Sequence, residues 1–211
     1  MKKTAKAAAL IAAMALAAGL TACQKKESAG GSGAIKVSAK DAEKAAGYLI
    51  MDGTTVMGYK EGLPAKLVIP EGVTKIGVLA FNSCFSLTEM TIPGSVKTIG
   101  DNAFVWCTKL KSVTIAEGVT EIGKEEAFKN CTSLTSVTIP ASVTLIGGGA
   151  FENCDSLKEI NYAGTKAQWD EIETTVYARS SALSREKKSK DKKNSLDFYG
   201  IVNCADGVVR L

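Results

Sequence analysis

Histidine is absent from this chain of 211 residues. Because histidine is the commonest general base and the commonest metal ligand, its absence counts against catalysis and against a metal site. Charge is nearly balanced as well. The chain has 26 basic and 22 acidic residues. Cleavage of the N-terminal signal segment described below would remove Lys2, Lys3 and Lys6 and leave 23 basic residues. A nucleic-acid-binding protein needs an excess of positive charge. We therefore expect no enzyme, no cofactor, no metal and no nucleic-acid partner.

The sequence also lacks an apolar run of the roughly 20 residues that a membrane-spanning helix needs. Its longest run, Ala7 to Leu20, has 14 residues and follows a basic start. The run leads into Leu20-Thr21-Ala22-Cys23, of which Leu20 is its last residue. These are the regions of a secretory signal, and the LTAC stretch resembles the bacterial lipobox. The resemblance implies that residues 1–22 are removed and that Cys23 is lipidated. An ordinary signal peptide with a nearby cysteine is the alternative.

Residues 24–34 are polar and rich in Gly and Ser, a composition typical of a flexible tether. We therefore assign residues 23–34 as a lipidated tether. The protein is expected to be exported, lipid-anchored to a bacterial membrane, and exposed at the cell surface or in the periplasm.

The rest of the chain is dominated by a repeat, which appears four times over residues 67–160. Two landmarks recur at spacings of 23, 24 and 23 residues, and the third unit carries one extra residue within 124–126. A solenoid tolerates such an insertion in a loop. The landmarks are Phe81, Phe104, Phe128 and Phe151, and in step with them Cys84, Cys107, Cys131 and Cys154.

Each unit contains a short alternating segment, such as Ser112 to Ile115, in which Val113 and Ile115 are apolar. That alternation predicts a half-buried strand. The strand is followed by Ile-Gly and then by Ala-Phe, where a short helical or 3₁₀ turn is expected. One unit cannot bury its apolar side alone, so stacked copies are needed. The pattern predicts a mainly β repeat solenoid.

Together, the recurring Ile-Pro, Ile-Gly, Ala-Phe and Cys resemble the BspA-like leucine-rich-repeat family. The resemblance implies a short solenoid and a role in adhesion to matrix proteins or other cells. Residues 35–66 are expected to form an irregular, hairpin-like N-terminal cap and residues 161–211 a C-terminal cap. Thr165 and Gln168 form a capping-box signature for a short helix with Trp169 and Ile172 inside, and the Asp-Gly pair at 206–207 predicts a hairpin.

The repeat cysteines do not fit a zinc site. Equivalent residues of a stacked array lie in a line about 4.8 Å apart, whereas zinc gathers four sulfurs tetrahedrally at about 2.3 Å. We expect buried free thiols packed as small hydrophobes. Disulfides between neighbouring layers are the alternative. With Cys23 lipidated, an odd number of cysteines is left, so at least one would lack a partner within the chain.

Three surfaces are candidates for binding. Trp106 departs from the repeat, where the other units have Ser or Asn, and is a candidate anchor; lateral packing against its neighbours is the alternative. The basic stretch 185–193 is a solvated loop or helix end, or a site for an anionic polymer. The outward strand residues are expected on the concave face, where they either bind or form a merely solvated polar ladder; besides Val68 they are Lys66, Glu89, Thr91, Ser112, Thr114, Ser136, Thr138, Glu159 and Asn161.

These features lead to the hypothesis of a cell-surface lipoprotein that binds a protein through its solenoid, without catalysis. The alternative is an envelope-organising structural lipoprotein that binds an anionic surface polymer through residues 185–193. The identity of the ligand and the oligomeric state are left open by the sequence.

Overall fold

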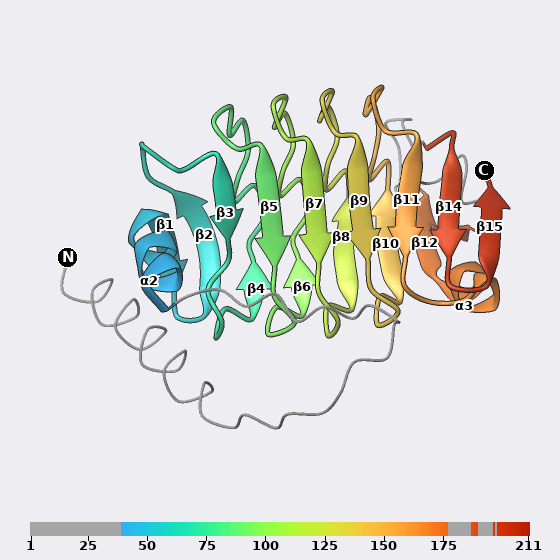
Figure 1. Cartoon of the computed structure of the whole chain (residues 1–211), viewed down its shortest axis with the longest axis horizontal. Coiled ribbons are helices and arrows are strands. Elements are labelled where there is room, and N and C mark those ends of the chain that lie inside the picture. The colour runs from blue at the N-terminus through green and yellow to red at the C-terminus, as the bar shows by residue number, and fades with distance from the viewer. Residues whose placement is uncertain (1–38, 177–186, 190–195, 197) are drawn as a thin grey trace.

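The chain forms a β-solenoid in which each repeat makes one coil (Figure 1). The structure is a computed structural model and describes residues 39–176, 187–189, 196 and 198–211. Two sheets of mainly parallel strands run along the solenoid. This architecture confirms the predicted mainly β repeat solenoid.

The first sheet has seven strands in the order β15-β14-β11-β9-β7-β5-β3. Residues of neighbouring coils pair in parallel with their repeat equivalents, as Met90 does with Val113 and Val113 with Val137. In β7, Val113 and Ile115 are buried while Ser112 and Thr114 are half-buried, as the alternation predicts. The strands are β3 (Lys66–Val68), β5 (Glu89–Ile92), β7 (Ser112–Ile115), β9 (Ser136–Ile139), β11 (Glu159–Tyr162), β14 (Ile201–Cys204) and β15 (Gly207–Arg210).

The second sheet has eight strands in the order β1-β2-β4-β6-β8-β10-β12-β13. The extra residue of the third unit is absorbed here, because the pairing of β10 with β8 shifts between Ile146 and Gly148 and regular register resumes afterwards. The strands are β1 (Leu49–Asp52), β2 (Thr55–Tyr59), β4 (Lys75–Ile76), β6 (Thr98–Ile99), β8 (Glu121–Glu125), β10 (Leu145–Gly148), β12 (Glu173–Val176) and β13 (Lys187–Ser189).

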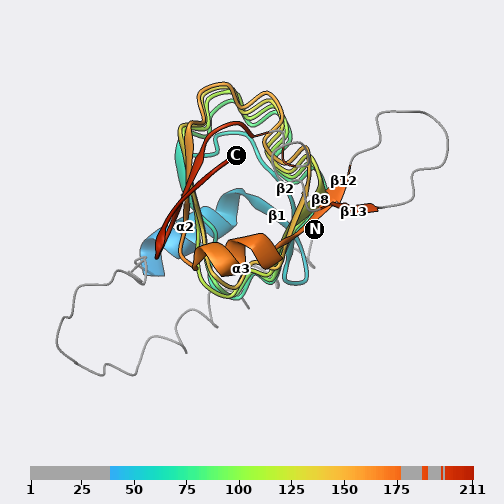
Figure 2. The same ribbon diagram turned by 90° about the vertical axis from the view of Figure 1, so that its right-hand side faces the viewer.

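A third side of each coil consists mainly of turns and also takes in the last residues of β8 and β10. We call it the turn wall and define it as residues 78–86, 101–109, 124–133 and 148–156. Viewed along the solenoid, the successive coils almost superimpose (Figure 2). The array is therefore nearly straight, and the expected concave face is instead the outer face of a nearly straight seven-stranded sheet.

The interior is filled by a ladder of stacked rings. Neighbouring rings from Phe81 to Phe151 lie 5.0–5.8 Å apart and within 6° of parallel. Tyr59 extends the stack at one end, at 6.0 Å from Phe81, and Phe198 meets Phe151 edge-on at 6.3 Å at the other. Offset stacked rings of this kind stabilise beyond the area they bury. The ladder thus joins the repeats to both flanking segments.

Both ends of the solenoid are covered by a short helix and a hairpin. Residues 35–66 contain the antiparallel hairpin β1–β2, but also the helix α2 (Ala39–Tyr48), which the sequence did not predict. At the other end, α3 (Lys166–Glu171) begins at the predicted capping box, and Trp169 and Ile172 are buried. The predicted Asp-Gly hairpin is β14–β15. No helix within the described residues is long and apolar enough to cross a membrane.

Candidate binding surfaces

The predicted strand residues lie together on the outer face of the seven-stranded sheet. Val68, Thr91, Thr114, Thr138 and Asn161 pair in one continuous row across β3, β5, β7, β9 and β11. The residue two positions earlier in each strand forms a second row, namely Lys66, Glu89, Ser112, Ser136 and Glu159. The fold therefore brings all of the predicted residues together on one flat, mostly short and polar surface.

We call this outer face of the seven-stranded sheet the strand face. Charged and amide side chains form contacts near both ends of it. Lys66 and Glu89 form an exposed ion pair with 2.8 Å between Nζ and Oε1. At the other end, Asn203 Nδ2 donates to Glu159 Oε2 at 3.1 Å and to Asn161 Oδ1 at 3.0 Å. Asn203 was missed by the sequence analysis because it lies outside the repeat, in β14. Exposed ion pairs contribute only about 0–1 kcal/mol, so these groups shape the surface more than they stabilise it.

The turn wall has an alternating backbone pattern. The N–H groups of Leu79, Phe81 and Ser83 donate to carbonyl oxygens of the next coil at 2.8–3.1 Å. The intervening N–H groups close tight turns within their own coil, as from Cys84 to Phe81 O at 3.1 Å. The expected helical or 3₁₀ segment therefore consists of single turns, since alternate N–H groups point along the solenoid axis and a continuous helix cannot form.

This alternation requires left-handed backbone at two positions in every coil. The residues before Ala form one column, which comprises Leu79, Asn102, Glu126 and Gly149, with φ between 50° and 64°. The residues before Cys form the second column, which comprises Ser83, Trp106, Asn130 and Asn153, with φ between 55° and 62°. Gly and Asn adopt this conformation most readily. Leu79, Trp106 and Glu126 are therefore unusual occupants.

Trp106 lies on the outer surface of the turn wall with 52% of its surface exposed. Its backbone N–H donates to Lys129 O at 2.9 Å, so its main chain is fixed to the next coil. The structure thus places the predicted anchor on a different side of the coil from the strand face. The two predicted binding features do not form a single site.

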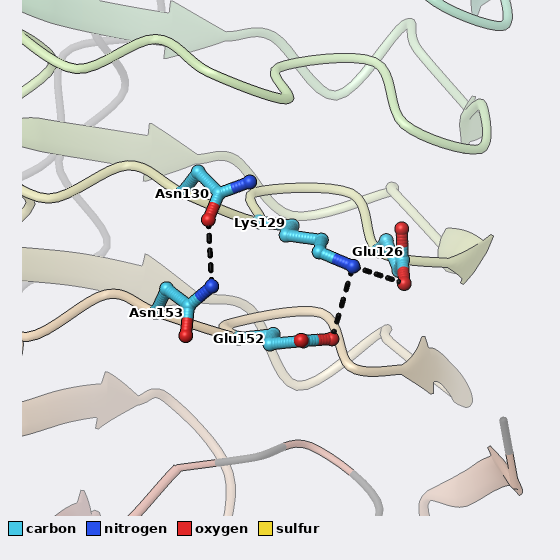
Figure 3. Close-up of polar contacts among 5 residues, drawn as sticks. All are labelled: Glu126, Lys129, Asn130, Glu152 and Asn153. Carbon is cyan, nitrogen blue, oxygen red and sulfur yellow. Dashed lines mark hydrogen bonds and ion pairs between the residues drawn. The ribbon is translucent and has the colours of Figure 1, made fainter. Parts of the chain in front are cut away.

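The third and fourth coils of the turn wall carry a polar cluster that the sequence analysis did not identify (Figure 3). Lys129 Nζ lies 2.7 Å from Glu126 Oε1 and 3.2 Å from Glu152 Oε2. Beside it, Asn153 Nδ2 donates to Asn130 Oδ1 at 2.7 Å. Burial lowers the pKa of Lys129, but hydrogen bonds to Glu126 and Glu152 outweigh burial, and the pKa is raised overall. Lys129 therefore stays charged and links two coils.

The repeat cysteines are buried free thiols in the described structure, with a hydrogen-bonding role the sequence analysis missed. The Sγ–H groups of Cys107, Cys131 and Cys154 each donate to the carbonyl of the Phe one coil earlier, at 3.1–3.2 Å. The neighbouring thiols of Cys107 and Cys154, together with burial, raise the pKa of Cys131. Burial likewise raises the pKa of Cys84. Because only the thiolate is a nucleophile, these cysteines are suited to packing rather than to chemistry.

Metal-ligating residues do not gather elsewhere either, since no group of three or more Cys, Asp or Glu side chains could hold an ion in the part of the chain that the structure describes. Three expected features lie outside the described residues, namely the signal peptide of residues 1–22, the tether of residues 23–34 with Cys23, and most of the basic stretch 185–193. Within that stretch, Lys187–Ser189 forms β13 and pairs antiparallel with β12, so these three residues form a strand and not a loop or helix end.

Comparison with known proteins identifies the repeat. Residues 60–184 match the family described as BspA type leucine rich repeat region, in six copies. Four of these copies, over residues 67–160, carry the regular Phe and Cys landmarks, and the flanking copies lack them. No curated protein matches the chain.

Solved structures of bacterial leucine-rich-repeat proteins are similar to this chain. A leucine-rich-repeat protein of T. pallidum is 30% identical over 56% of this chain and 61% of its own, with a TM-score of 0.48. A leucine-rich cell surface protein of Faecalibacterium prausnitzii A2-165 is 32% identical over 61% of this chain and 39% of its own, with a TM-score of 0.43. The chain thus spans less than two thirds of the length of these proteins.

Proposed function

Since the chain belongs to the BspA-type leucine-rich-repeat family, whose repeats are typically non-catalytic binding modules, we propose that it binds a protein at the bacterial cell surface through the outside of its solenoid. One observation carries the proposal. The inward residues are alike in every coil. The outward residues of the strand face and turn wall lie in straight rows, because hydrogen bonds between coils hold equivalent positions side by side. Repeat proteins use such extended surfaces for recognition.

We further propose that the protein is held at the membrane by lipid on Cys23. The LTAC stretch after the apolar run supports this proposal, and the Gly- and Ser-rich residues 24–34 would let the solenoid reach away from the bilayer. Replacing Cys23 with Ser should abolish labelling with a radioactive fatty acid and leave an uncleaved or misplaced precursor. Acylated protein of mature size from this variant would overturn lipidation at Cys23.

The binding function is tested by cross-linking the mature protein on intact cells and identifying the partner by mass spectrometry. Three variants are compared with the wild type. One changes Thr91, Thr114 and Thr138 to Lys, one changes Trp106 to Asn, and one neutralises the charges of residues 185–193. Loss of the partner in the first or second variant alone supports protein binding by the solenoid.

Loss only in the variant of residues 185–193 would instead support the alternative, an envelope-organising lipoprotein that binds an anionic surface polymer. That alternative rests on the dense basic run REKKSKDKK. Binding to the polymer would weaken steeply with added salt, because exposed charges are screened over about 10 Å at 0.1 M. A wild-type protein that cross-links to no protein would overturn the proposed function.

A further inference from the structure

The two ends of the turn wall differ in exposed apolar surface. Val78, Leu79, Phe85 and Trp106 are each at least half exposed, with fractions of 50–55%. All four belong to the first two segments of the wall. Among the described residues, no large hydrophobic side chain of segments 124–133 and 148–156 is exposed to this degree. Clustered exposed apolar residues with a polar rim mark interaction sites.

Two of these side chains lie on residues with strained, left-handed backbone. Leu79 and Trp106 have φ of 58° and 62°, and left-handed backbone costs an ordinary residue roughly 1–2 kcal/mol. Of the six equivalent positions in the other coils, four hold Gly or Asn, which avoid most of this cost, and the other two hold Glu126 and Ser83. Leu79 and Trp106 remain about half exposed, so only part of each side chain gains from burial. A strained residue whose side chain faces solvent motivates the hypothesis that the side chain has a function.

The main chain beneath these side chains is fixed by hydrogen bonds between coils. Ser83 N–H donates to Val105 O at 2.9 Å, and Leu79 N–H donates to Asp101 O at 3.1 Å. These bonds join the first two coils, so that Ser83 lies beside Trp106 in its column and Phe85 follows two residues later. A surface that is already ordered binds with a smaller entropy loss.

The charge of the wall indicates what would lie against it. The first segment, residues 78–86, has no charged side chain. The third and fourth segments contain four acidic and two basic residues. Glu126 and Glu152 are buried and share Lys129, so the exposed acidic side chains are Glu125 and Asp155. A partner that spans the wall is therefore favoured if it has apolar side chains at one end and basic side chains at the other.

From these observations we infer that the turn wall, and not the strand face, is the contact surface for a protein segment that carries apolar side chains followed by basic ones. The apolar side chains pack on Leu79, Phe85 and Trp106, and the basic side chains lie over the third and fourth coils. This inference rests on the proposed function and narrows it to one face and one partner chemistry. Aliphatic Val78 and Leu79 favour a protein over a glycan, which stacks on aromatic rings.

A random peptide library displayed on phage tests the inference. It is selected on the wild-type protein in parallel with the double variant Leu79→Asn, Trp106→Asn, which restores a residue suited to left-handed backbone at both sites. We expect peptides that combine apolar with Lys or Arg residues to be enriched on the wild type alone. Equal enrichment on both proteins, or enrichment of acidic peptides, overturns the inference.

The chain offers a built-in readout for the enriched peptides. Trp106 is half exposed whereas Trp169 is fully buried, so iodide quenches mainly Trp106. Bound peptide should protect Trp106 from iodide, and its Lys/Arg→Glu counterpart should bind at least about tenfold more weakly. The Thr91, Thr114 and Thr138 to Ala variant is the matched control and should bind the peptide like the wild type.

Two further outcomes separate this inference from the proposed function. If the partner cross-linked on cells is retained by the Trp106→Asn variant and lost with the strand-face variant, the protein-binding function stands and the turn-wall inference is wrong. If the wild type binds no peptide but retains defined glycans on a microarray through Trp106, the partner is a carbohydrate and the inference is also wrong.

Discussion

The inside of each coil and the left-handed columns of its turn wall follow opposite rules. Inside, every coil has the same Phe and Cys, with ring separations of 5.0–5.8 Å between successive Phe residues. In the column before Cys, the four coils hold Ser83, Trp106, Asn130 and Asn153, although the backbone is the same within 7° of φ. Folding therefore requires the same backbone in every coil and the same interior Phe and Cys, but it allows different side chains at the position before Cys.

The difference shows where recognition is built. Interior residues are fixed by close packing, since a change of one methylene group is felt in a dense core. In the left-handed columns, Leu79, Trp106 and Asn153 are exposed, whereas Glu126 and Asn130 are buried in polar contacts. The exposed positions are under a weaker packing constraint. A departure from the repeat in these columns, such as Trp106, therefore points to recognition. The same departure in the interior would be interpreted as a packing defect.

The interior side of the contrast is tested by Phe104→Ala. Phe104 is fully buried between two parallel rings, at 5.2 Å from Phe81 and 5.0 Å from Phe128. Its loss should lower the free energy of unfolding by about 3–5 kcal/mol. Urea unfolding followed by circular dichroism measures the change. The outward variant Ser112→Ala is the control and should change stability by no more than about 0.5 kcal/mol.

Close approach between coils predicts the second effect. A Cβ on Gly100 would lie 2.7 Å from backbone atoms of Gly77 and Val78. We expect Gly100→Ala to lower the free energy of unfolding by about 1–3 kcal/mol, because neighbouring coils must move apart. Gly47 in α2 is the matched control, since a Cβ added there would have no neighbouring atom within 4 Å. Gly47→Ala should be neutral or slightly stabilising, and an equal loss at both sites would contradict the explanation.

Much of the interior could be predicted from the sequence, because it repeats and depends on short-range patterns. The strand alternation, the stacking of coils, the capping box at Thr165 and the hairpin at Gly207 are local signals of this kind. By contrast, β14 pairs with β11 and Phe198 extends the ring ladder. These contacts join segments about 40 residues apart in the chain. They could not be predicted because β14 and Phe198 lie outside the periodic pattern of the repeat.

The candidate surfaces were predicted only in part for a related reason. The strand rows follow from alternation, and Trp106 stands out against Ser and Asn at equivalent positions. The left-handed columns had a signal in Asn102, Asn130 and Asn153, but Leu79 and Glu126 obscure it. The cluster around Lys129 depends on side chains of two coils meeting across the wall, which the spacing of one unit does not show.

The third prediction concerns the polar end of the wall. Lys129→Met leaves the carboxylates of Glu126 and Glu152 without their shared cation and should lower stability by about 1 kcal/mol near pH 8. The pKa of Lys129 is raised in the folded protein. Its contribution is therefore complete below the unfolded-state pKa of about 10.4 and is lost as pH rises through the folded-state pKa.

The gap between wild type and Lys129→Met should accordingly shrink above about pH 10.4. Urea midpoints recorded at several pH values measure this gap. Lys109→Met on the second coil is the matched control, because Lys109 is exposed and belongs to no ion pair among those found in the described residues. A gap that stays constant with pH would show that Lys129 stabilises the wall by packing and not by charge.

Trp106→Asn is expected to have the smallest effect on stability of these substitutions, although it should have the largest effect on binding. Trp106→Asn relieves left-handed strain and gives up a side chain that is 52% exposed. The free energy of unfolding should therefore stay the same or rise by up to about 1 kcal/mol. Buried Trp169 remains as the fluorescent reporter of unfolding, and Ser83→Asn in the same column is the control. If Trp106→Asn instead lowered stability by more than about 1 kcal/mol, Trp106 would belong to the folding side of the contrast, because its ring would then be holding the second and third coils together.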